Sequence, residues 1–220
     1  MDINVPRNVI GIDGLIGCNR SAVVQILKES NSSYYIVEEP IAEFCKLTTN
    51  NHRTISPVDL FYKNDVDAFA LQMHILKCWE KKMEKVQRDM IELGAYYNAL
   101  IYSRSPLSLK VFAQTLHKMN KIGNLGWEMF KLEFDEFLTK YDQLIPTFTV
   151  YFDTPIANCL ARQKRKARLA ETRYQPMEQY LKELRKSATH IYEDNLDLQF
   201  RKVSTLNILD RVDAVKQYIK

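Results

Sequence analysis

Three of the six glycines of this 220-residue chain lie close together near its N-terminus. They are Gly11, Gly14 and Gly17, whereas an average composition of about 7% glycine would spread roughly 15 glycines along the chain. Residues 14–21 read Gly-Leu-Ile-Gly-Cys-Asn-Arg-Ser, which has the frame of the pattern G-x-x-x-x-G-K-[ST]. In that pattern, backbone N–H groups and a helix N-terminus bind phosphate groups, a cation neutralises them and a hydroxyl holds Mg²⁺. The spacing therefore predicts a phosphate-binding loop.

Two of the four fixed positions of this pattern carry other residues. Asn19 replaces the second glycine, but Asn tolerates a positive φ better than most residues do. Arg20 keeps a positive charge in a longer, planar group, and Ser21 keeps the hydroxyl that would hold Mg²⁺. A glycine-rich turn that binds no ligand is the alternative. The position of the loop directly after the first predicted strand favours a phosphate site.

Charged residues also follow two later apolar runs. Glu38 and Glu39 come after residues 34–37, and Arg104 comes after residues 99–102. In a parallel sheet these residues would lie at the same edge as the glycine-rich loop. A carboxylate there could accept the proton of a hydroxyl that attacks a phosphoryl group, and an arginine could clamp a phosphate. Acids that cap the following helix, and a surface salt bridge, are the alternatives.

The positive charge of the chain is concentrated in residues 162–168. The formal net charge is +4, but this segment carries five basic side chains, so the rest of the chain is slightly acidic. Such local charge favours a specific anionic ligand over a nucleic-acid-binding face, and the segment lacks the interleaved aromatic residues of an RNA-binding patch. We expect Arg162, Lys166 and Arg168 to converge on transferred phosphates as a mobile lid. A solvated run of charges is the alternative.

Strand-like and helix-like patterns alternate along the chain and would position these groups. Short apolar runs predict strands at residues 8–12, 34–37, 99–102, 147–152 and 200–203. Apolar residues spaced by three and four predict helices over residues 21–29, 76–93, 127–144 and 177–191. This order is typical of an α/β fold with a mostly parallel sheet covered on both faces. We find no internal repeat or linker, so residues 1–220 are expected to form a single domain.

The composition is that of an ordinary globular protein, with 46% hydrophobic and 26% charged residues. No apolar run approaches the ~20 residues that cross a bilayer, and the N-terminus does not have the pattern of a secretory signal. The four cysteines are scattered without a metal-binding spacing. These features predict an intracellular, cytoplasmic protein with free thiols and no membrane segment.

Taken in order, these motifs resemble the deoxynucleoside kinase family over residues 9–184. Residues 10–16 are similar to its strand and phosphate loop, and Glu39-Pro40-Ile41-Ala42-Glu43-Phe44 is similar to its Glu-Pro-Val-x-x-Trp motif. The resemblance makes Glu39 the general base on the sugar 5′-hydroxyl and places Phe44 in the aromatic wall of the substrate pocket. It also implies a P-loop fold with a parallel five-stranded sheet and a lid over about residues 162–174.

Further positions follow from the same resemblance. Tyr62 would bond the sugar 3′-hydroxyl, and Gln72 would bond the Watson–Crick edge of the base. Arg104 matches the arginine of the family's Glu/Asp-Arg-Ser motif, and Glu171 lies at the lid position that contacts the sugar. The expected activity is transfer of the γ-phosphoryl group of ATP, or of another nucleoside triphosphate, with Mg²⁺ to a deoxynucleoside. Family members are commonly homodimers, so we expect a homodimer.

The chain departs from the family pattern mainly near the phosphates and the metal. Ser103 stands where the family has an acid beside Mg²⁺, and Lys166 replaces a lid arginine. In the nucleoside pocket Leu71 replaces a stacking Phe and Leu109 replaces an Asp. A catalytically impaired protein that binds nucleosides or has a structural role is therefore an alternative. A thymidylate kinase is a further alternative, but its second strand would lead into an Asp-Arg pair.

Overall fold

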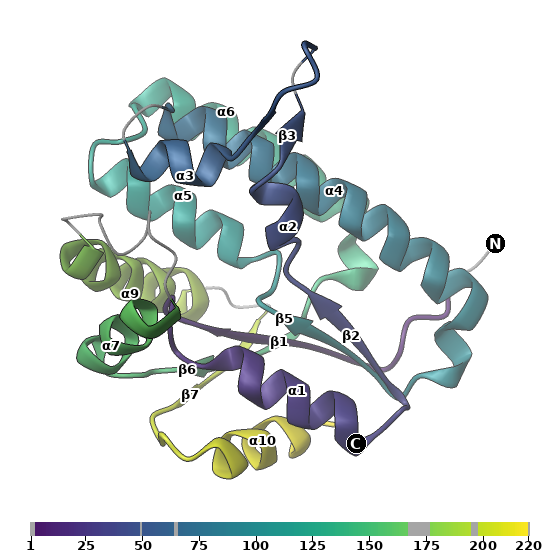
Figure 1. The fold of residues 1–220 in the computed structure, drawn as a ribbon. Coiled ribbons are helices and arrows are strands. Elements are labelled where there is room, and N and C mark those ends of the chain that lie inside the picture. The colour runs from purple at the N-terminus through teal and green to yellow at the C-terminus, as the bar shows by residue number, and fades with distance from the viewer. Residues whose placement is uncertain (1–2, 49, 64–65, 167–176, 195–197, 220) are drawn as a thin grey trace.

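The centre of the molecule is a parallel β-sheet of five strands (Figure 1). The computed structural model describes residues 3–48, 50–63, 66–166, 177–194 and 198–219. The strands lie in the order β2-β5-β1-β6-β7 and all pair in parallel. Their bounds are β1 (Asn8–Gly14), β2 (Tyr34–Glu38), β5 (Ala99–Ser103), β6 (Phe148–Phe152) and β7 (Gln199–Val203). The five predicted strands are therefore confirmed, and with them the parallel α/β fold.

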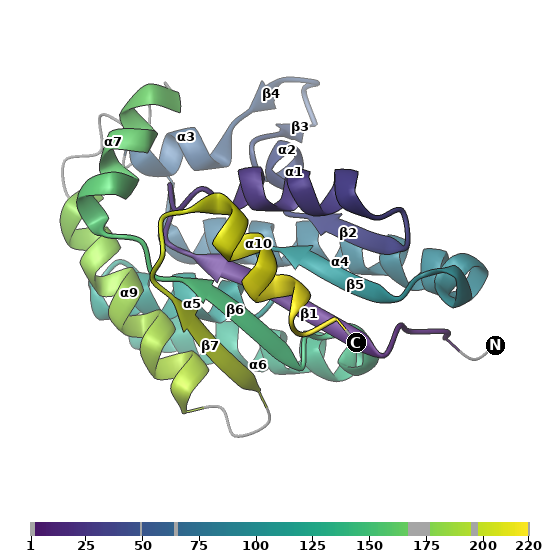
Figure 2. The same cartoon turned by 90° about the horizontal axis from the view of Figure 1, so that it is seen from below.

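Helices cover both faces of this sheet, as Figures 1 and 2 show from two directions. On one face α1 (Arg20–Ser30) packs against α10 (Ile208–Lys216). On the other face α4 (Ala68–Leu93) and α6 (Asn124–Lys140) contact α5 (Ser108–Lys118), which also contacts α9 (Met177–Glu193). The helix α7 (Ile156–Lys166) follows β6 and contacts α9. None of the described helices combines the length and the apolar character that crossing a membrane requires.

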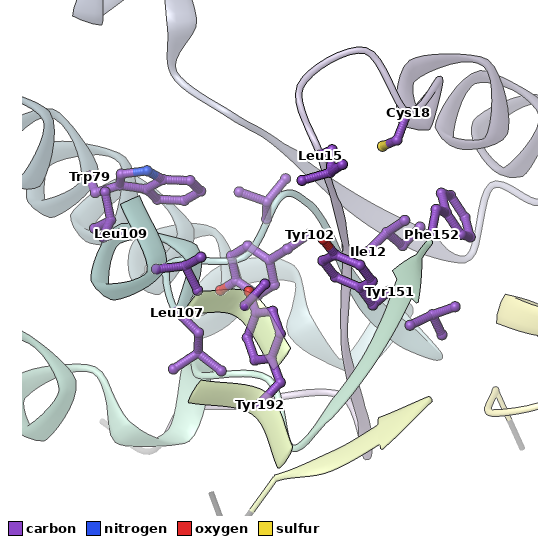
Figure 3. Close-up of a cluster of buried hydrophobic side chains, with 14 of the residues drawn as sticks. Ile12, Leu15, Cys18, Trp79, Tyr102, Leu107, Leu109, Tyr151, Phe152 and Tyr192 are labelled. Atoms are coloured by element: carbon purple, nitrogen blue, oxygen red, sulfur yellow. The ribbon is translucent and has the colours of Figure 1, made fainter. Parts of the chain in front are cut away.

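The core lies between the sheet and the long helices, because the central strands are apolar on both faces. β5 contributes four consecutive buried residues, which is typical of a strand in a parallel sheet. Tyr102 of this strand lies among buried side chains and donates a hydrogen bond to the carbonyl of Leu144 at 2.8 Å (Figure 3). Trp79 of α4 is also buried in this core.

Two helices differ in extent from the sequence prediction. α4 begins at Ala68, ahead of the predicted residue 76, because Asp67 caps its first turn by accepting a hydrogen bond from the N–H of Ala70 at 3.0 Å. α6 ends at Lys140, and the last predicted turn is the 3₁₀ helix η2 (Asp142–Leu144). The apolar spacing continues through η2, so periodicity alone could not locate this end.

Several short elements after β2 lack a pattern long enough to predict. They are α2 (Ile41–Phe44), the two-stranded hairpin of β3 (Leu47–Thr48) and β4 (Thr54–Ile55), α3 (Pro57–Tyr62) and the 3₁₀ helix η1 (Gly94–Tyr96). α2 and α3 both pack against α4. α2 and α3 thereby lie over the carboxyl end of the sheet, where the candidate site lies (Figure 1).

Candidate active site

The glycine-rich loop joins the end of β1 to the start of α1 and has the backbone conformation that its residue types suggest. Gly14 and Gly17 have φ angles of 151° and 85°, and Asn19 is left-handed with φ 74°. A Cβ atom on Gly17 would lie 2.5 Å from the carbonyl oxygen of Cys159 in α7. Gly17 is therefore required both by its backbone angle and by the close approach of α7. Asn19 adopts the positive φ that we expected it to tolerate.

Four charged side chains form a network between this loop and the neighbouring strands. Arg20 Nη2 lies 3.3 Å from Glu39 Oε2, and Arg104 Nε lies 3.1 Å from the same oxygen. Arg104 Nη1 lies 4.0 Å from Asp13 Oδ1. The structure therefore brings together Arg20, Glu39 and Arg104, which the sequence placed at one edge of the sheet. Glu39 accepts hydrogen bonds from arginines and does not cap α2, whose N-terminus has no side-chain cap.

Arg104 is buried at the end of β5 and is fixed by its backbone as well as by its ion pairs. Its φ is 72°, and its N–H donates to the carbonyl of Ile12 at 2.9 Å. The guanidinium carbon lies 4.8 Å from the centroid of the Phe112 ring. Burial alone would lower the pKa of Arg104, but the carboxylates of Glu39 and Asp13 outweigh it and raise that pKa. Arg104 is thus a permanent positive charge in a buried position, which excludes the alternative of a surface salt bridge.

Asp13 is a member of the network that the sequence interpretation missed. Its Oδ2 accepts hydrogen bonds from the Ser105 hydroxyl at 2.7 Å and from the Tyr192 hydroxyl at 2.9 Å. Burial, reinforced by the Asp13 carboxylate, raises the pKa of Tyr192, so its hydroxyl stays protonated and donates. These bonds orient the carboxylate that faces Arg104. The sequence does contain a signal for this role, because Asp13 directly follows an apolar run predicted to be a strand. A buried carboxylate is tolerated only where hydrogen bonds or ion pairs compensate for its burial.

A cavity of about 460 Å³ opens beside this network. Phe44, Tyr62 and Gln72, expected to contact the nucleoside, all line it. The Gln72 side chain is only 3% exposed, and its Oε1 has no hydrogen-bond partner among the described residues. The remaining walls are mainly apolar and include Leu71, Ile75, Trp79, Leu109, Phe112 and Tyr180. The cavity therefore offers mainly apolar walls and one unsatisfied amide oxygen, which suits a heterocycle with a polar edge.

The glycine-rich loop and the apolar walls belong to one continuous cavity. Gly17, Asn19, Arg20 and Ser21 line it together with Arg104. Residues 10–216 match the family model of deoxynucleoside kinase. The chain belongs to the deoxynucleoside kinase family. It is therefore a phosphotransferase of the deoxynucleoside kinase class, which uses a nucleotide as its phosphate donor.

Solved structures with the same fold include deoxyadenosine kinase from M. mycoides. Its structure with bound dCTP is 18% identical in sequence and has a TM-score of 0.72, covering 94% of this chain and 96% of that chain. The structure of the same enzyme with the products dCMP and a flexible dCDP is 17% identical with a TM-score of 0.71, at the same coverage of both chains. No curated protein sequence matches this chain. At these sequence identities the likeness shows a shared fold only. The assignment to the deoxynucleoside kinase family rests on the match of residues 10–216 to the family model.

Part of the lid expected from the deoxynucleoside kinase resemblance lies outside the described residues. Arg168 and Glu171 lie outside the described residues. Lys166 is the last residue of α7, and the position of its side chain is not described. Arg162 is described, and its Nη1 donates to the carbonyl of Gly17 at 3.3 Å. In this structure Arg162 therefore contacts the glycine-rich loop itself.

The residues that would hold Mg²⁺ in this member of the deoxynucleoside kinase family are few. Ser21 is exposed in the cavity at the start of α1, and Ser103 lines the same wall. The described part of the chain has no cluster of three His, Cys, Asp or Glu side chains that could hold a metal ion. Mg²⁺ commonly takes one or two protein ligands and fills the rest of its shell with water and substrate phosphates. The Ser21 hydroxyl fits that kind of site.

Proposed function

We propose that Glu39 is the general base for transfer of the γ-phosphoryl group of ATP, or of another nucleoside triphosphate, to the 5′-hydroxyl of a deoxynucleoside. The observation that carries this assignment is the position of its carboxylate. Both arginines bond Oε2, and no described residue bonds Oε1, so one carboxylate oxygen can accept a proton. The carboxylate lines the cavity between the phosphate loop and the nucleoside walls.

The nucleoside would be held by groups on α2, α3 and α4. Phe44 and the apolar walls support the two faces of the base, and the amide of Gln72 bonds its polar edge. The unpartnered Oε1 of Gln72 supports this role, since a buried acceptor without a bond is costly unless a ligand satisfies it. Tyr62 bonds the 3′-hydroxyl, and Glu171 of the lid contacts the sugar. Together these contacts direct the 5′-hydroxyl toward Glu39.

In the reaction, the 5′-oxygen forms a bond to the γ-phosphorus as Glu39 takes the hydroxyl proton. The bond between the γ-phosphorus and the bridging oxygen breaks, so that a nucleoside diphosphate leaves with the electron pair. Arg20, Arg104, Arg162 and Arg168 stabilise the charge that spreads over the transferred group. The backbone N–H groups of the loop that runs from Gly14, at the end of β1, through Gly17 to Asn19, at the N-terminus of α1, bind the donor phosphates.

Mg²⁺ would enter with the triphosphate and be held by the Ser21 hydroxyl and by donor phosphate oxygens. When bound, it neutralises charge on the β- and γ-phosphates. Ser103 has no carboxylate to bind the ion, so this chain relies on the donor phosphates and water for most of the metal shell.

A transfer assay with four deoxynucleosides tests the proposed function. Purified protein is incubated with Mg-ATP and thymidine, deoxycytidine, deoxyadenosine or deoxyguanosine in turn, and the monophosphate is separated by chromatography. We expect product with at least one of the four. No product with any of them, together with a rise in melting temperature on adding nucleosides but not ATP, would instead support the catalytically impaired alternative.

We also propose that the protein is a homodimer that pairs through α6. Leu125, Met129 and Leu132 lie on one face of this helix at spacings of four and three, and they are 75%, 47% and 67% exposed. Apolar residues of this size in one stripe favour contact with a second apolar surface. Light scattering after size-exclusion chromatography should give twice the mass of the 25.8 kDa chain. Leu132→Lys should then shift the mass to one chain, and a monomeric wild type would refute the dimer.

A cytoplasmic location is the compartment we propose. None of the four cysteines, all of which are described, forms a disulfide bond, which is typical of proteins from a reducing environment. Cell fractionation with a tagged protein tests this location, and recovery in a membrane or secreted fraction would contradict it.

A further inference from the structure

Three consecutive carbonyl groups of the phosphate loop are bonded by side chains from outside it. Gln163 Nε2 donates to the carbonyl of Ile16 at 3.1 Å, and Arg162 Nη1 donates to that of Gly17 at 3.3 Å. Arg211 Nη1 donates to the carbonyl of Cys18 at 2.6 Å. Two of these side chains come from α7 and the third comes from α10, close to the C-terminus. The loop is thus clamped by elements far away in the sequence.

Arg211 is the most deeply buried of the three clamping side chains, at 1% exposure. Besides the Cys18 carbonyl, it donates to the Thr154 hydroxyl at 2.7 Å and to the Thr205 carbonyl at 2.7 Å. Its guanidinium carbon lies 4.6 Å from the centroid of the Phe152 ring. Every group that it bonds is neutral, and no ion pair to a carboxylate is formed within the described part of the chain.

A buried cation without a carboxylate is costly. Burial lowers the pKa of Arg211, and the neighbouring Arg162 adds to that effect. Removing a charge from water is tolerated only where hydrogen bonds compensate for it. A neutral side chain could fill the same volume at a lower cost, so general stability does not explain an arginine here. Its bond to the phosphate loop offers a functional reason.

The direction of the clamped carbonyls determines where the loop N–H groups point. In a trans peptide the C=O and the following N–H point in opposite directions, and no cis peptide bond occurs among the described residues. A bond that draws the Cys18 carbonyl toward α10 therefore turns the N–H of Asn19 the other way. In the same manner the bond to the Ile16 carbonyl turns the N–H of Gly17 away from α7. Gly17 and Asn19 both line the cavity, where the donor phosphates are proposed to bind.

We propose that Arg211 is a positioning residue for the triphosphate donor. It holds the peptide between Cys18 and Asn19 in the orientation that presents an N–H group to the phosphates. This role matters more here than in a loop with glycine at position 19, because Asn19 must be kept in its left-handed conformation (φ 74°). Arg211 does not touch the reacting atoms, so it acts through the loop. The inference rests on the proposed function, because it assigns the donor phosphates to this loop.

The test compares Arg211→Met and Arg211→Lys with a matched control, Arg185→Met. Arg185 also bonds residue 154, through its carbonyl at 2.6 Å, and pairs with Asp153 at 3.2 Å. No bond from Arg185 to the phosphate loop is found among the described residues. We expect Arg211→Met to raise the KM for Mg-ATP about 10- to 100-fold, the factor that one hydrogen bond to a charged group supplies. The KM for the deoxynucleoside should change less than about twofold.

Arg211→Lys keeps the charge and one hydrogen bond, so it should raise the KM for Mg-ATP by a smaller factor. If Arg211→Met does not fold, the KM of Arg211→Lys still tests the proposal. Millimolar guanidinium should restore part of the ATP affinity of Arg211→Met. Arg185→Met should leave the ratio of the two KM values unchanged. Equal changes in both KM values, or an unchanged KM for Mg-ATP in a folded Arg211 variant, would overturn the proposal.

Failure of the proposed function can be told apart from failure of this inference. If the wild type transfers no phosphoryl group, calorimetric titration with Mg-ATP still measures donor binding. Weaker binding by Arg211→Lys than by Arg185→Met would then support the positioning role without catalysis. Equal binding by the two variants would overturn it.

Discussion

Replacing Glu39 by glutamine should affect both catalysis and the ion-pair network, and the two effects can be measured separately. Glutamine has the same shape but cannot accept the proton of the 5′-hydroxyl at neutral pH. General base catalysis contributes typically about 10²- to 10⁴-fold, so we expect kcat of Glu39→Gln to fall by this factor. The KM for the deoxynucleoside should stay within about threefold, because Phe44, Tyr62 and Gln72 are untouched.

The effect on stability follows from the two arginine contacts. Glu39 is 16% exposed at its side chain and accepts from Arg20 and Arg104 at 3.3 and 3.1 Å. Loss of its charge leaves both guanidiniums without their shared carboxylate, although Asp13 still faces Arg104. Hydrogen bonds to charged groups contribute about 1.5–3 kcal/mol, and glutamine keeps one acceptor oxygen, so the free energy of unfolding should fall by about 1–3 kcal/mol.

Single-turnover kinetics and urea unfolding of the same preparations measure the two effects separately. Glu43→Gln is the matched control, because Glu43 is exposed on the same short helix α2. It should change kcat less than about twofold and the free energy of unfolding by less than about 0.5 kcal/mol. If Glu39→Gln retains kcat within about tenfold of the wild type, Glu39 is not the general base.

Further predictions concern the loop, the thiols and the metal. Gly17→Ala places a Cβ atom 2.5 Å from the Cys159 carbonyl at φ 85°, so it should cost at least about 2 kcal/mol in urea unfolding. The Cβ atom of Gly123→Ala would have no atom within 4 Å, so this control should lower the free energy of unfolding by less than about 1 kcal/mol. Equal losses of unfolding free energy in the two variants would contradict the loop geometry. Burial raises the pKa of Cys159 to about 12, so its thiolate fraction at pH 8 is about 10⁻⁴. A thiol reagent should therefore modify the half-buried Cys45 of the cavity first, and a bound deoxynucleoside should slow this modification. Mass spectrometry that shows Cys159 modified first would refute this order. Chelation of divalent cations should abolish phosphoryl transfer and added Mg²⁺ should restore it, whereas full activity in excess chelator would exclude the Ser21 metal site.

The strands and the convergence of charges at their ends could be predicted from the sequence. Apolar runs identify buried parallel strands because both faces of such strands are covered. Once β1, β2 and β5 are neighbours, the residues that follow them must meet at one edge, as Arg20, Glu39 and Arg104 do. The left-handed conformation of Asn19 also follows from local chemistry.

The partners that hold this site in place could not be predicted from local patterns. The Tyr192 hydroxyl bonds Asp13 across 179 residues, and Arg211 bonds the Cys18 carbonyl across 193 residues. Tyr192 and Arg211 lie in helices whose apolar spacing explains their burial without indicating a polar partner. Such contacts depend on how α9 and α10 pack against the sheet, which the spacing of residues within one helix does not determine.

A crystal structure with a deoxynucleoside and an unreactive triphosphate analogue tests the central assignment most directly. We expect the base against Gln72, the donor phosphates on the N–H groups of residues 14–21, and the 5′-hydroxyl within hydrogen-bond distance of Glu39, about 2.6–3.2 Å. A triphosphate bound away from this loop, or a 5′-hydroxyl that points away from Glu39, would contradict it.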